Sequence, residues 1–493
     1  MMNVSEGVPS IGIAYLAGTA KAAGHDVVVV DAFGEAPYKA TRLPGTNLLI
    51  HGITAEEIAE RVPTDVDLIG VSCMYSNEWV YYREVLGRLA ISHARIPLVI
   101  GGEHVTADPE YSLRQCPQVH CAVLGEGETT LANLIDDVTA GVPLDRSRVQ
   151  GIAFVNPDGA FVKTEAQARI RSIDEIPLPS WDESPLENYL ANGLGMAARR
   201  GRNMPMLASR GCPYQCTFCS NPNMWGLQWL PRDPRLVLDE MKHWIDKYRV
   251  THIEFYDLTT IVKKSWIMEF TDLLLQENLG VTWALPSGTR SEALDAEVVD
   301  RLYRSGCRDL TYAPESGSPE TLKRIKKKVH IPKMLASMTA AARHGIFIKA
   351  NMILGFPGQT MKEVAESYWF MVRMAWAGVR DVAVFPFVPY PGSELFFQLV
   401  REGRIVKGGN YEAFLSGNVY NEVSGMTSWS EYISNRRLKF LTVGGMAWFY
   451  GFQFLFRPWR LMGSLRRLLA NRPRTMMERL VDAKRAALWP STT

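Results

Sequence analysis

Short apolar runs alternate with helix-like stretches twice along this chain, first over residues 11–142 and again over residues 206–399. Continuous apolar strands between helices are typical of a parallel sheet that is covered on both faces. In the first region we predict strands at residues 26–32, 67–74, 96–102 and 119–128. This region therefore predicts a doubly wound, flavodoxin-like α/β domain.

The second region holds six apolar runs, each separated from the next by a helical stretch. The runs cover residues 205–210, 252–257, 282–288, 309–316, 348–355 and 381–389. Six βα units predict a partial parallel (β/α)6 barrel, which is open along one side and carries its chemistry at the carboxyl ends of its strands.

The chain divides into four segments on these patterns. Residues 151–164 are predicted to form a hairpin around Asn156–Gly159, and a linker punctuated by prolines follows them. We therefore predict an α/β domain at residues 1–145, a hairpin and linker at 146–200, a barrel at 201–402, and a basic, partly apolar helical region at 403–493.

The composition is that of an ordinary globular protein, with 47% apolar and 22% charged residues and a formal net charge of +2. This balance gives no reason to expect a nucleic-acid partner. The chain has seven cysteines, an odd number, and the segment Met1–Ser10 lacks the pattern of a signal peptide. We therefore expect a cytoplasmic protein in a reducing compartment.

Three cysteines lie close together in the stretch ASRGCPYQCTFCSNPNMWG, which directly follows a predicted strand. Cys212, Cys216 and Cys219 have the spacing C-x3-C-x2-C, and no fourth cysteine is near them. A structural zinc site needs four protein ligands, and three cysteines cannot all form disulfides. Three thiolates can instead hold a [4Fe-4S] cluster that keeps one iron free for another ligand.

This loop resembles that of the radical S-adenosylmethionine (SAM) superfamily, in which an aromatic residue, here Phe218, precedes the last cysteine. The resemblance implies that Cys212, Cys216 and Cys219 ligate a [4Fe-4S] cluster, and that the free iron chelates the amino and carboxylate groups of SAM. It also implies that an electron from the cluster cleaves SAM to methionine and a 5′-deoxyadenosyl radical.

Further segments of the second region resemble the SAM-binding motifs of that superfamily, in the same order along the chain. They are EFYDLTT, LPSGTR, APESGSPETLKRIKK, ILGFPGQT and PFVPYPGSELF, with Ala313 in place of the usual first glycine of the third motif. Asp257 is the expected acceptor for the SAM ammonium group, and Arg290 is a suitable donor to its carboxylate. The full set of SAM contacts that the resemblance implies is Phe218, Asp257, Ser287, Arg290, Glu315, Gly355, Pro357 and Gly358.

The loops that follow the predicted strands of the first region contain small residues, in GVSCMYSN, GGEHVTADPE and LGEGETT. Together with residues 9–32 they resemble the cobalamin-binding domain of the cobalamin-dependent radical SAM class. We expect the first strand of that domain either to be absent or to precede the start of this sequence. No D-x-H-x-x-G motif offers a histidine to cobalt, so His104 is expected to form hydrogen bonds within its loop. The cobalamin contacts that the resemblance implies are Ser72, Gly101, Gly102, His104, Thr106, Gly125, Gly127 and Glu128.

A cobalamin domain beside a radical SAM barrel implies a C-methyltransferase, in which 5′-deoxyadenosyl makes a radical at an unactivated carbon and methylcobalamin supplies the methyl group. The loops of the two domains are then expected to face each other with the substrate between them. The alternatives are a cobalamin-binding radical SAM enzyme without methyl transfer, such as an oxidative cyclase, and an iron–sulfur or cobalamin sensor. We expect a small-molecule substrate and a flavodoxin or ferredoxin as electron donor.

The last part of the chain is basic and partly apolar. Residues 431–493 hold 12 Lys or Arg against 3 Asp or Glu, an excess of about nine positive charges, and residues 440–456 carry no charge. We expect a helix packed against the barrel, although the basic flanks and aromatic residues also fit membrane-surface contact through residues 440–474. A span is the third alternative, since this run is at the lower length limit for one. Membrane contact would favour a lipid-soluble substrate.

Overall fold

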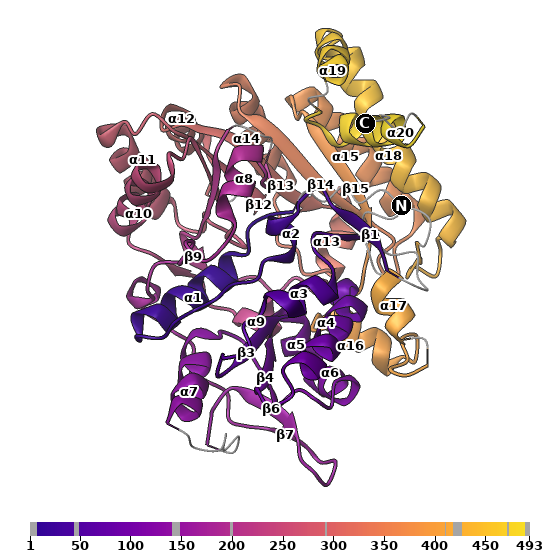
Figure 1. Cartoon of the computed structure of the whole chain (residues 1–493). Coiled ribbons are helices and arrows are strands. Elements are labelled where there is room, and N and C mark those ends of the chain that lie inside the picture. The colour runs from indigo at the N-terminus through magenta and orange to yellow at the C-terminus, as the bar shows by residue number, and fades with distance from the viewer. Residues whose placement is uncertain are drawn as a thin grey trace.

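The computed structural model of the chain describes residues 7–43, 49–140, 148–197, 201–290, 293–409, 411–417, 426–470 and 473–488. Figure 1 shows a smaller sheet and a larger sheet, with helices around both and with the last helices of the chain beside the larger sheet. Most strand pairs in the two sheets are parallel. The molecule is therefore mixed α/β, as the alternation of apolar and helical stretches predicts.

The smaller sheet has five strands in the order β3-β4-β5-β6-β7. β3, β4 and β5 pair in parallel, whereas β6 and β7 form a hairpin that adds antiparallel to β5. The hairpin that we predict after the α/β domain thus extends the sheet of that domain. The strands are Ile69–Ser72, Leu98–Gly101, Cys121–Val123, Ile152–Val155 and Phe161–Lys163.

Helices surround this sheet, and α3 packs on α4 while α1 packs on α7. The helices are α1 (Ile11–Ala22), α3 (Ala55–Arg61), α4 (Trp79–Ser92), α5 (Glu103–Ala107), α6 (Pro109–Gln115) and α7 (Glu128–Thr139). Two further sheets have two antiparallel strands each. They are β1 (Ala40–Arg42) with β2 (Leu49–His51), and β9 (Ser209–Arg210) with β10 (Leu230–Pro231).

No strand forms at residues 26–32, so the prediction of a strand there is wrong. The run ends at Asp31, whose carboxylate accepts hydrogen bonds from the backbone N–H of Gly34 at 3.0 Å and from the hydroxyl of Tyr189 at 2.8 Å. These bonds start the short helix α2 (Ala32–Glu35). A strand at residues 26–32 would need a neighbouring strand to complete its backbone hydrogen bonds. Among the described strands β3 pairs only with β4, so residues 26–32 do not join the sheet beside it.

The larger sheet contains six parallel strands in the order β8-β11-β12-β13-β14-β15. Each predicted strand of this region overlaps one of them, so the partial parallel barrel is confirmed. The strands are Asn203–Met206, His252–Phe255, Thr282–Thr289, Cys307–Glu315, Phe347–Leu354 and Asp381–Pro386.

The helices of the βα units pack behind these strands (Figure 1). The rings of Phe270 and Trp283 both meet that of Phe255 edge to face, at centroid distances of 5.7 and 5.9 Å. Such pairs contribute beyond the apolar area that they bury. The helices are α10 (Pro234–Tyr248), α11 (Lys264–Glu277), α12 (Ala296–Arg304), α13 (Pro319–Arg324), α14 (Ile331–Arg343), α15 (Met361–Ala377) and α16 (Glu394–Arg401).

Helix α18 (Asn435–Phe456) lies along the last barrel strand, β15, and beside α15. It buries Phe449 and Tyr450, and the side-chain amide of Gln453 donates to the carbonyl of Arg380 at 2.9 Å, just before β15 begins. In this position the helix covers the edge of the sheet. The prediction of a helix packed against the barrel is confirmed, and nowhere in the described ranges is a helix both long and apolar enough to cross a membrane.

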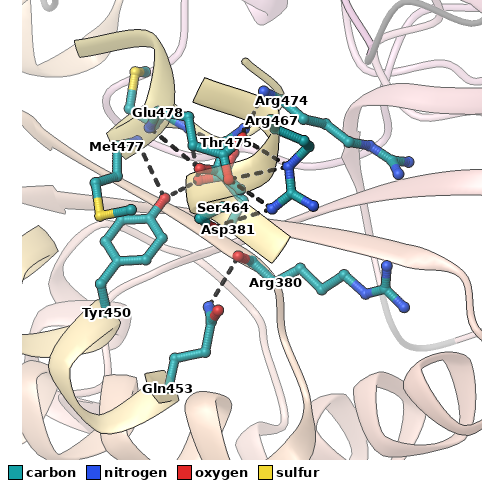
Figure 2. Close-up of polar contacts among 11 residues, drawn as sticks. Arg380, Asp381, Tyr450, Gln453, Ser464, Arg467, Arg474, Thr475, Met477 and Glu478 are labelled. Atoms are coloured by element: carbon teal, nitrogen blue, oxygen red, sulfur yellow. Dashed lines mark hydrogen bonds and ion pairs between the residues drawn. The ribbon is translucent and has the colours of Figure 1, made fainter. Parts of the chain in front are cut away.

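The chain after α18 is held together by a buried carboxylate (Figure 2). Glu478 lies in α20 (Met476–Leu488), has no exposed surface, and accepts a hydrogen bond of 2.6 Å from the guanidinium of Arg467 in α19 (Trp459–Leu469). The backbone N–H of Arg474 donates to the same carboxylate at 2.8 Å. Glu478 therefore fixes the turn between the last two helices.

Two carboxylates of the barrel fix this turn to the amino ends of the strands. Asp309, near the start of β13, accepts from the guanidinium of Arg474 at 3.0 Å. Asp381, the first residue of β15, accepts from the hydroxyl of Tyr450 at 2.5 Å and from the backbone N–H of Met476 at 3.1 Å. The last two helices thus cover the end of the barrel opposite to the carboxyl ends.

The substitution Glu478→Gln is expected to lower the free energy of unfolding by about 1.5–3 kcal/mol at neutral pH, because it removes the charge from buried hydrogen bonds. Burial alone would raise the pKa of Glu478, but the bonds from Arg467 and its neighbours outweigh burial and hold it below 4.5. The contribution of the ionised carboxylate to stability is complete above about pH 4.5, the ordinary pKa of glutamate. It is lost as the pH falls through the lower pKa that Glu478 has in the folded protein. Urea denaturation at neutral and at acid pH measures both effects.

Glu394→Gln is the matched control, because Glu394 pairs with Lys326 at the surface. It should change the free energy of unfolding by at most about 1 kcal/mol. A difference between wild type and Glu478→Gln that stays constant on acidification would contradict the assigned role of the carboxylate.

Candidate functional site

The carboxyl ends of the two parallel sheets face each other across the domain boundary, as the sequence analysis expects. The loop after β4 carries Glu103, which accepts a hydrogen bond from the hydroxyl of Ser220, directly after the third clustered cysteine. Helix α5 contacts α9 (Asn221–Trp225) of the second domain. The loop after β15 also approaches the first domain, because a Cβ on Gly392 would lie 3.0 Å from the Cβ of Ala107 in α5. The candidate site therefore lies between the domains.

The cysteine loop begins at the end of β9 and leads into α9. β9 pairs with β10, which follows α9, so the two ends of the loop segment are held together. Within the loop, the backbone N–H of Thr217 donates to the carbonyl of Ile325 at 3.1 Å, and the N–H of Leu395 donates to the carbonyl of Thr217 at 2.9 Å. The barrel thus anchors the loop from two further segments.

The thiols of Cys212, Cys216 and Cys219 are free and interact electrostatically. Burial raises the pKa of Cys212, and it raises that of Cys219 to about 12, so a metal centre is needed to make them thiolates. Across the described ranges no three His, Cys, Asp or Glu side chains are placed to hold a single metal ion. A structural zinc site needs four protein ligands, whereas three thiols on one anchored loop suit an iron–sulfur cluster that keeps one iron free.

A buried lysine that the sequence analysis missed lies beside this loop. The ammonium of Lys327 donates to Glu315 at 2.9 Å and lies 5.8 Å from the ring centroid of Phe218. Burial alone would lower the pKa of Lys327, but Glu315 outweighs burial and raises it. Lys327 is one of five basic residues in the stretch 323–328, a pattern typical of a solvated surface, so the sequence carried no signal for its burial.

Glu315 occupies an unusual position at the end of β13. Its backbone has a φ of 63°, in the left-handed region that residues other than glycine and asparagine rarely adopt. Strain of this kind persists only where neighbouring contacts over-determine the position, and it is concentrated at functional sites. The ion pair with Lys327 supplies such a contact, and the predicted role of Glu315 toward SAM stays a prediction.

Three more predicted SAM contacts lie at the ends of neighbouring strands. Asp257 follows β11, is buried, and accepts from the N–H of Ala208 at 3.1 Å and from the hydroxyl of Ser209 at 2.5 Å. Burial raises the pKa of Asp257 to about 6. Ser287 is half-buried near the end of β12, and Arg290 follows that strand.

Arg290 is buried against the cysteine loop. Its guanidinium lies 3.5 Å from the ring centroid of Tyr214, between the first two clustered cysteines, and donates to the carbonyl of Lys328. Both Lys327 and Arg290 lower the pKa of Cys212 electrostatically, against the larger effect of burial. Two cations therefore stand beside the thiols, where a negatively charged group would be stabilised.

The loop Gly355–Gly358 after β14 is shaped by the tail of the chain. Gly355 has a φ of 90°, and a Cβ there would lie 2.9 Å from the side chain of Leu438 in α18. The backbone N–H of Gly358 donates to the carboxylate of Glu431 at 2.8 Å, and Pro357 lies between the two glycines. Segment 426–438 thus supports the loop that we predict to contact adenine.

The predicted cobalamin residues collect at the carboxyl ends of β3, β4 and β5. Ser72 ends β3, Gly101 ends β4, and Gly102 follows directly before α5. Gly102 has a φ of 107°, and a Cβ there would lie 2.7 Å from the carbonyl of Cys73, so only glycine fits. This close approach of two strand-end loops suits the docking of a large planar ligand on backbone.

The loop after β5 is positioned by Thr106 of α5. The hydroxyl of Thr106 accepts from the N–H of Gly125 at 3.0 Å, and Gly127 directly precedes α7. Gly125 faces the second domain, since a Cβ there would lie 3.7 Å from the carbonyl of Met224 in α9. These residues therefore lie at the domain boundary, and their contacts with cobalamin stay predictions.

His104 is fully engaged within its own domain. Its Nδ1 lies 2.9 Å from the hydroxyl of Ser76, its Nε2 lies 3.3 Å from that of Ser112, and its ring packs 4.8 Å from that of Trp79. Burial, with Lys407, lowers the pKa of His104 to about 4. Because both ring nitrogens have protein partners, His104 is not placed to ligate cobalt, in agreement with its expected role as a hydrogen-bonding residue in its loop.

Glu128 takes part in a buried ionic cluster that the sequence analysis did not foresee. The guanidinium of Arg210, at the end of β9, donates to Glu128 at 2.5 Å and to Glu126 at 3.3 Å. The rings of Tyr15 and Trp225 lie 5.0 and 5.7 Å from that guanidinium. The loops after β3, β4 and β5, which we predict to bind cobalamin, are called here the cobalamin loops. Arg210 is two residues before Cys212, so the cluster links the cysteine loop to the cobalamin loop after β5.

Comparison with known families divides the chain at the same place. The B12 binding domain family matches residues 2–135, and the Radical SAM superfamily matches residues 206–371. Together the two matches cover the cysteine loop and the loops that follow β3, β4 and β5. They support the cofactor set of a [4Fe-4S] cluster, SAM and cobalamin.

Several relatives match most of the chain. It is 28% identical to an uncharacterized methyltransferase of Pyrococcus horikoshii, over 79% of this chain and 78% of the relative. It is 26% identical to a cytidylyl-2-hydroxyethylphosphonate methyltransferase of Streptomyces wedmorensis, over 80% and 78%. It is 27% identical to an anaerobic magnesium-protoporphyrin IX monomethyl ester cyclase of Rubrivivax gelatinosus, over 79% and 66%.

A solved structure shares the arrangement of the two domains. The radical SAM methyltransferase TsrM of Kitasatospora setae, solved with cobalamin and a [4Fe-4S] cluster, superposes with a TM-score of 0.64 at 15% identity. The superposition covers 82% of this chain and 75% of TsrM. This likeness shows the fold, in which both sheets turn their carboxyl ends toward one space.

Proposed function

Because this chain joins a B12-binding domain to a radical SAM domain and so belongs to the cobalamin-binding radical SAM enzymes, we propose that it methylates an unactivated carbon of a small molecule. One observation carries this proposal. The cysteine loop and the cobalamin loops meet across the domain boundary through Arg210 with Glu128 and through Ser220 with Glu103. A radical generator and a methyl carrier must be this close to act on one substrate carbon.

When bound, the cluster, SAM and cobalamin supply the electron, the carbon radical and the methyl group. The residues of this chain hold and enclose them. The three clustered cysteines provide the thiolates, and the neighbouring cations Lys327 and Arg290 offset negative charge around them. Asp257 is placed at a strand end to accept from an ammonium group, and burial between the domains keeps water out of the site.

We propose a flavodoxin or ferredoxin as the electron donor, because an iron–sulfur cluster of this kind needs single electrons at low potential. We also propose a cytoplasmic location. No disulfide joins any of the seven cysteines, all of which lie in the described ranges, and thiols of this kind are usual in a reducing compartment.

An oxidative cyclase is the second candidate function. Its support is the match to the Rubrivivax cyclase, whose identity to this chain equals that of the methyltransferase relatives within a few percent. Such an enzyme would use the same three cofactors without transferring a methyl group.

Product analysis separates the candidates. The full-length enzyme is reconstituted anaerobically with iron, sulfide and cobalamin, reduced, and incubated with SAM and cell extract. A methyltransferase yields both S-adenosylhomocysteine and 5′-deoxyadenosine, whereas a cyclase yields only 5′-deoxyadenosine and a sensor yields neither. Formation of 5′-deoxyadenosine without S-adenosylhomocysteine, in the presence of a consumed substrate, would refute methyl transfer.

A further inference from the structure

We propose that the outer surface of α15, α18 and α19 binds to an anionic lipid bilayer. This surface, called here the aromatic face, is defined by the exposed side chains Trp369, Trp376, Phe440, Trp448, Leu455 and Trp459. They belong to α15 and α18, which pack side by side, and to α19, which contacts α18, and α18 lies along the last strand of the barrel (Figure 1). The face lies outside the domain boundary where the cofactors are expected, and neither family match accounts for α18 or α19.

The aromatic face is one continuous surface. The ring of Trp376 in α15 meets that of Phe456 in α18 at 5.1 Å, Phe456 meets Phe452 at 5.8 Å, and Phe452 meets Trp448 at 4.9 Å. Trp448 in turn lies 6.0 Å from Tyr368 of α15. Aromatic contacts therefore connect the two helices along the second half of α18, from Trp448 to Phe456.

Water covers this surface in the isolated chain. Trp376 is 70% exposed, Leu455 is 71% exposed, Phe440 is 67% exposed and Trp459 is 66% exposed. Soluble proteins rarely expose a contiguous apolar patch of this kind without a partner to bury it. Tryptophan is also enriched where proteins meet the boundary between lipid headgroups and hydrocarbon.

The charges around the aromatic face favour an anionic partner. Helices α18 and α19 contain six Arg or Lys and no Asp or Glu, and of the six Arg460 and Arg467 are bound within the protein. Arg436, Arg437 and Lys439 precede the first exposed apolar residue of α18, and the guanidinium of Arg436 lies 6.0 Å from the ring of Phe440. The nearest acidic residue before α18, Glu431, is bound to Arg404 and to the N–H of Gly358.

A second copy of this chain fits the face less well. A two-fold symmetric contact would bring the same basic surface of both copies together, and such an accumulation of like charge is unfavourable. Phosphate groups of anionic lipids complement them, and each Lys or Arg near such a surface contributes about 1 kcal/mol. Apolar side chains flanked by arginines are the pattern of a helix that lies in a membrane interface.

The packing of α18 determines which side of the helix can contact the bilayer. Its inner side is bound to the barrel, through Tyr450 with Asp381 and through Gln453 with the carbonyl of Arg380. The helix therefore presents only its outer side, between Phe440 and Leu455, and lies along the membrane surface without crossing it.

One consequence, unlike the binding itself, rests on the proposed function. α18 begins beside the loop Gly355–Gly358, where Leu438 contacts Gly355 at the carboxyl end of the barrel. Bilayer binding through the start of α18 would hold the mouth of the site near the membrane. A lipid-soluble substrate could then reach the space between the domains directly.

Vesicle sedimentation tests the proposal with the full-length holoenzyme. The vesicles contain either phosphatidylcholine alone or equal parts of phosphatidylcholine and phosphatidylglycerol. We expect sedimentation with the anionic vesicles that weakens as salt is added. The double variant Trp376→Gln/Leu455→Gln should bind at least about tenfold more weakly, because it removes two apolar side chains from the contact.

Ile91→Gln in α4 is the matched control, since Ile91 is equally exposed but lies on the first domain. It should bind as wild type does. Circular dichroism and the cluster absorbance of each variant show that the fold is kept. Equal binding of wild type and the double variant, or no binding of wild type to anionic vesicles, would overturn the proposal. So would a wild-type dimer in sedimentation equilibrium that the double variant converts to monomer.

Discussion

Replacing Cys216 with alanine is expected to abolish the formation of 5′-deoxyadenosine and to leave the purified protein without the broad visible absorbance of a [4Fe-4S] cluster. Only three thiols stand on the loop, and no other cysteine of the chain lies on it. Two thiolates cannot hold the cluster in the form that keeps one iron free. After anaerobic reconstitution, product chromatography and the visible spectrum with iron and sulfide analysis measure the two effects. The product yield is expected to fall at least about a hundredfold, and the cluster signal to background.

Cys116→Ala is the matched control for this experiment. Cys116 follows α6 in the first domain, outside the cysteine loop, and its side chain is fully buried. This variant should keep its cluster and its product yield. Retention of iron and of SAM cleavage in the Cys216→Ala variant would refute the assignment of the cluster, and with it the proposed function.

The barrel could be predicted from the sequence because each of its strands is short, apolar and followed by a helix. The run at 348–355, for example, becomes β14 with nearly the same ends. The run at 26–32 has the same local pattern and forms no strand. The local pattern of apolar residues indicates which segments can form strands. Whether a segment does so depends on a neighbouring strand that can pair with it, and the local pattern does not reveal that neighbour.

The residues of the candidate site also fall into two groups, those that the local sequence reveals and those that it does not. The three clustered cysteines and the glycine turns could be found because their chemistry depends on spacing within one loop. Lys327 and Arg210 could not, because the role of each depends on a contact that only the folded chain creates, with Glu315 twelve residues away and with Glu128 82 residues away respectively. A basic side chain in a basic stretch carries no sign of burial until the tertiary structure supplies the carboxylate that pairs with it.

Arg210→Met is expected to lower the free energy of unfolding by about 3–5 kcal/mol, because it leaves buried carboxylates without their partner. Arg210 is almost fully buried, and it donates to Glu128 and Glu126 across the domain boundary. Burial alone would lower the pKa of Arg210, but Glu128 outweighs burial and raises it, so the guanidinium stays charged. Urea denaturation followed by circular dichroism measures the loss.

The double variant Arg210→Met/Glu128→Gln separates a lost ion pair from a lost packing contact. Removing the charge of Glu128 should recover part of the stability, because the penalty of Arg210→Met arises largely from the unpaired carboxylate. Arg304→Met is the control, since its pair with Asp300 is exposed and 3.6 Å long, and it should cost at most about 0.5 kcal/mol. If Arg210→Met cost no more than this control, the ionic cluster would not join the domains.

Because Arg210 is two residues before Cys212, the same substitution should also loosen the cysteine loop, and occupancy of the iron–sulfur cluster after reconstitution should fall with stability.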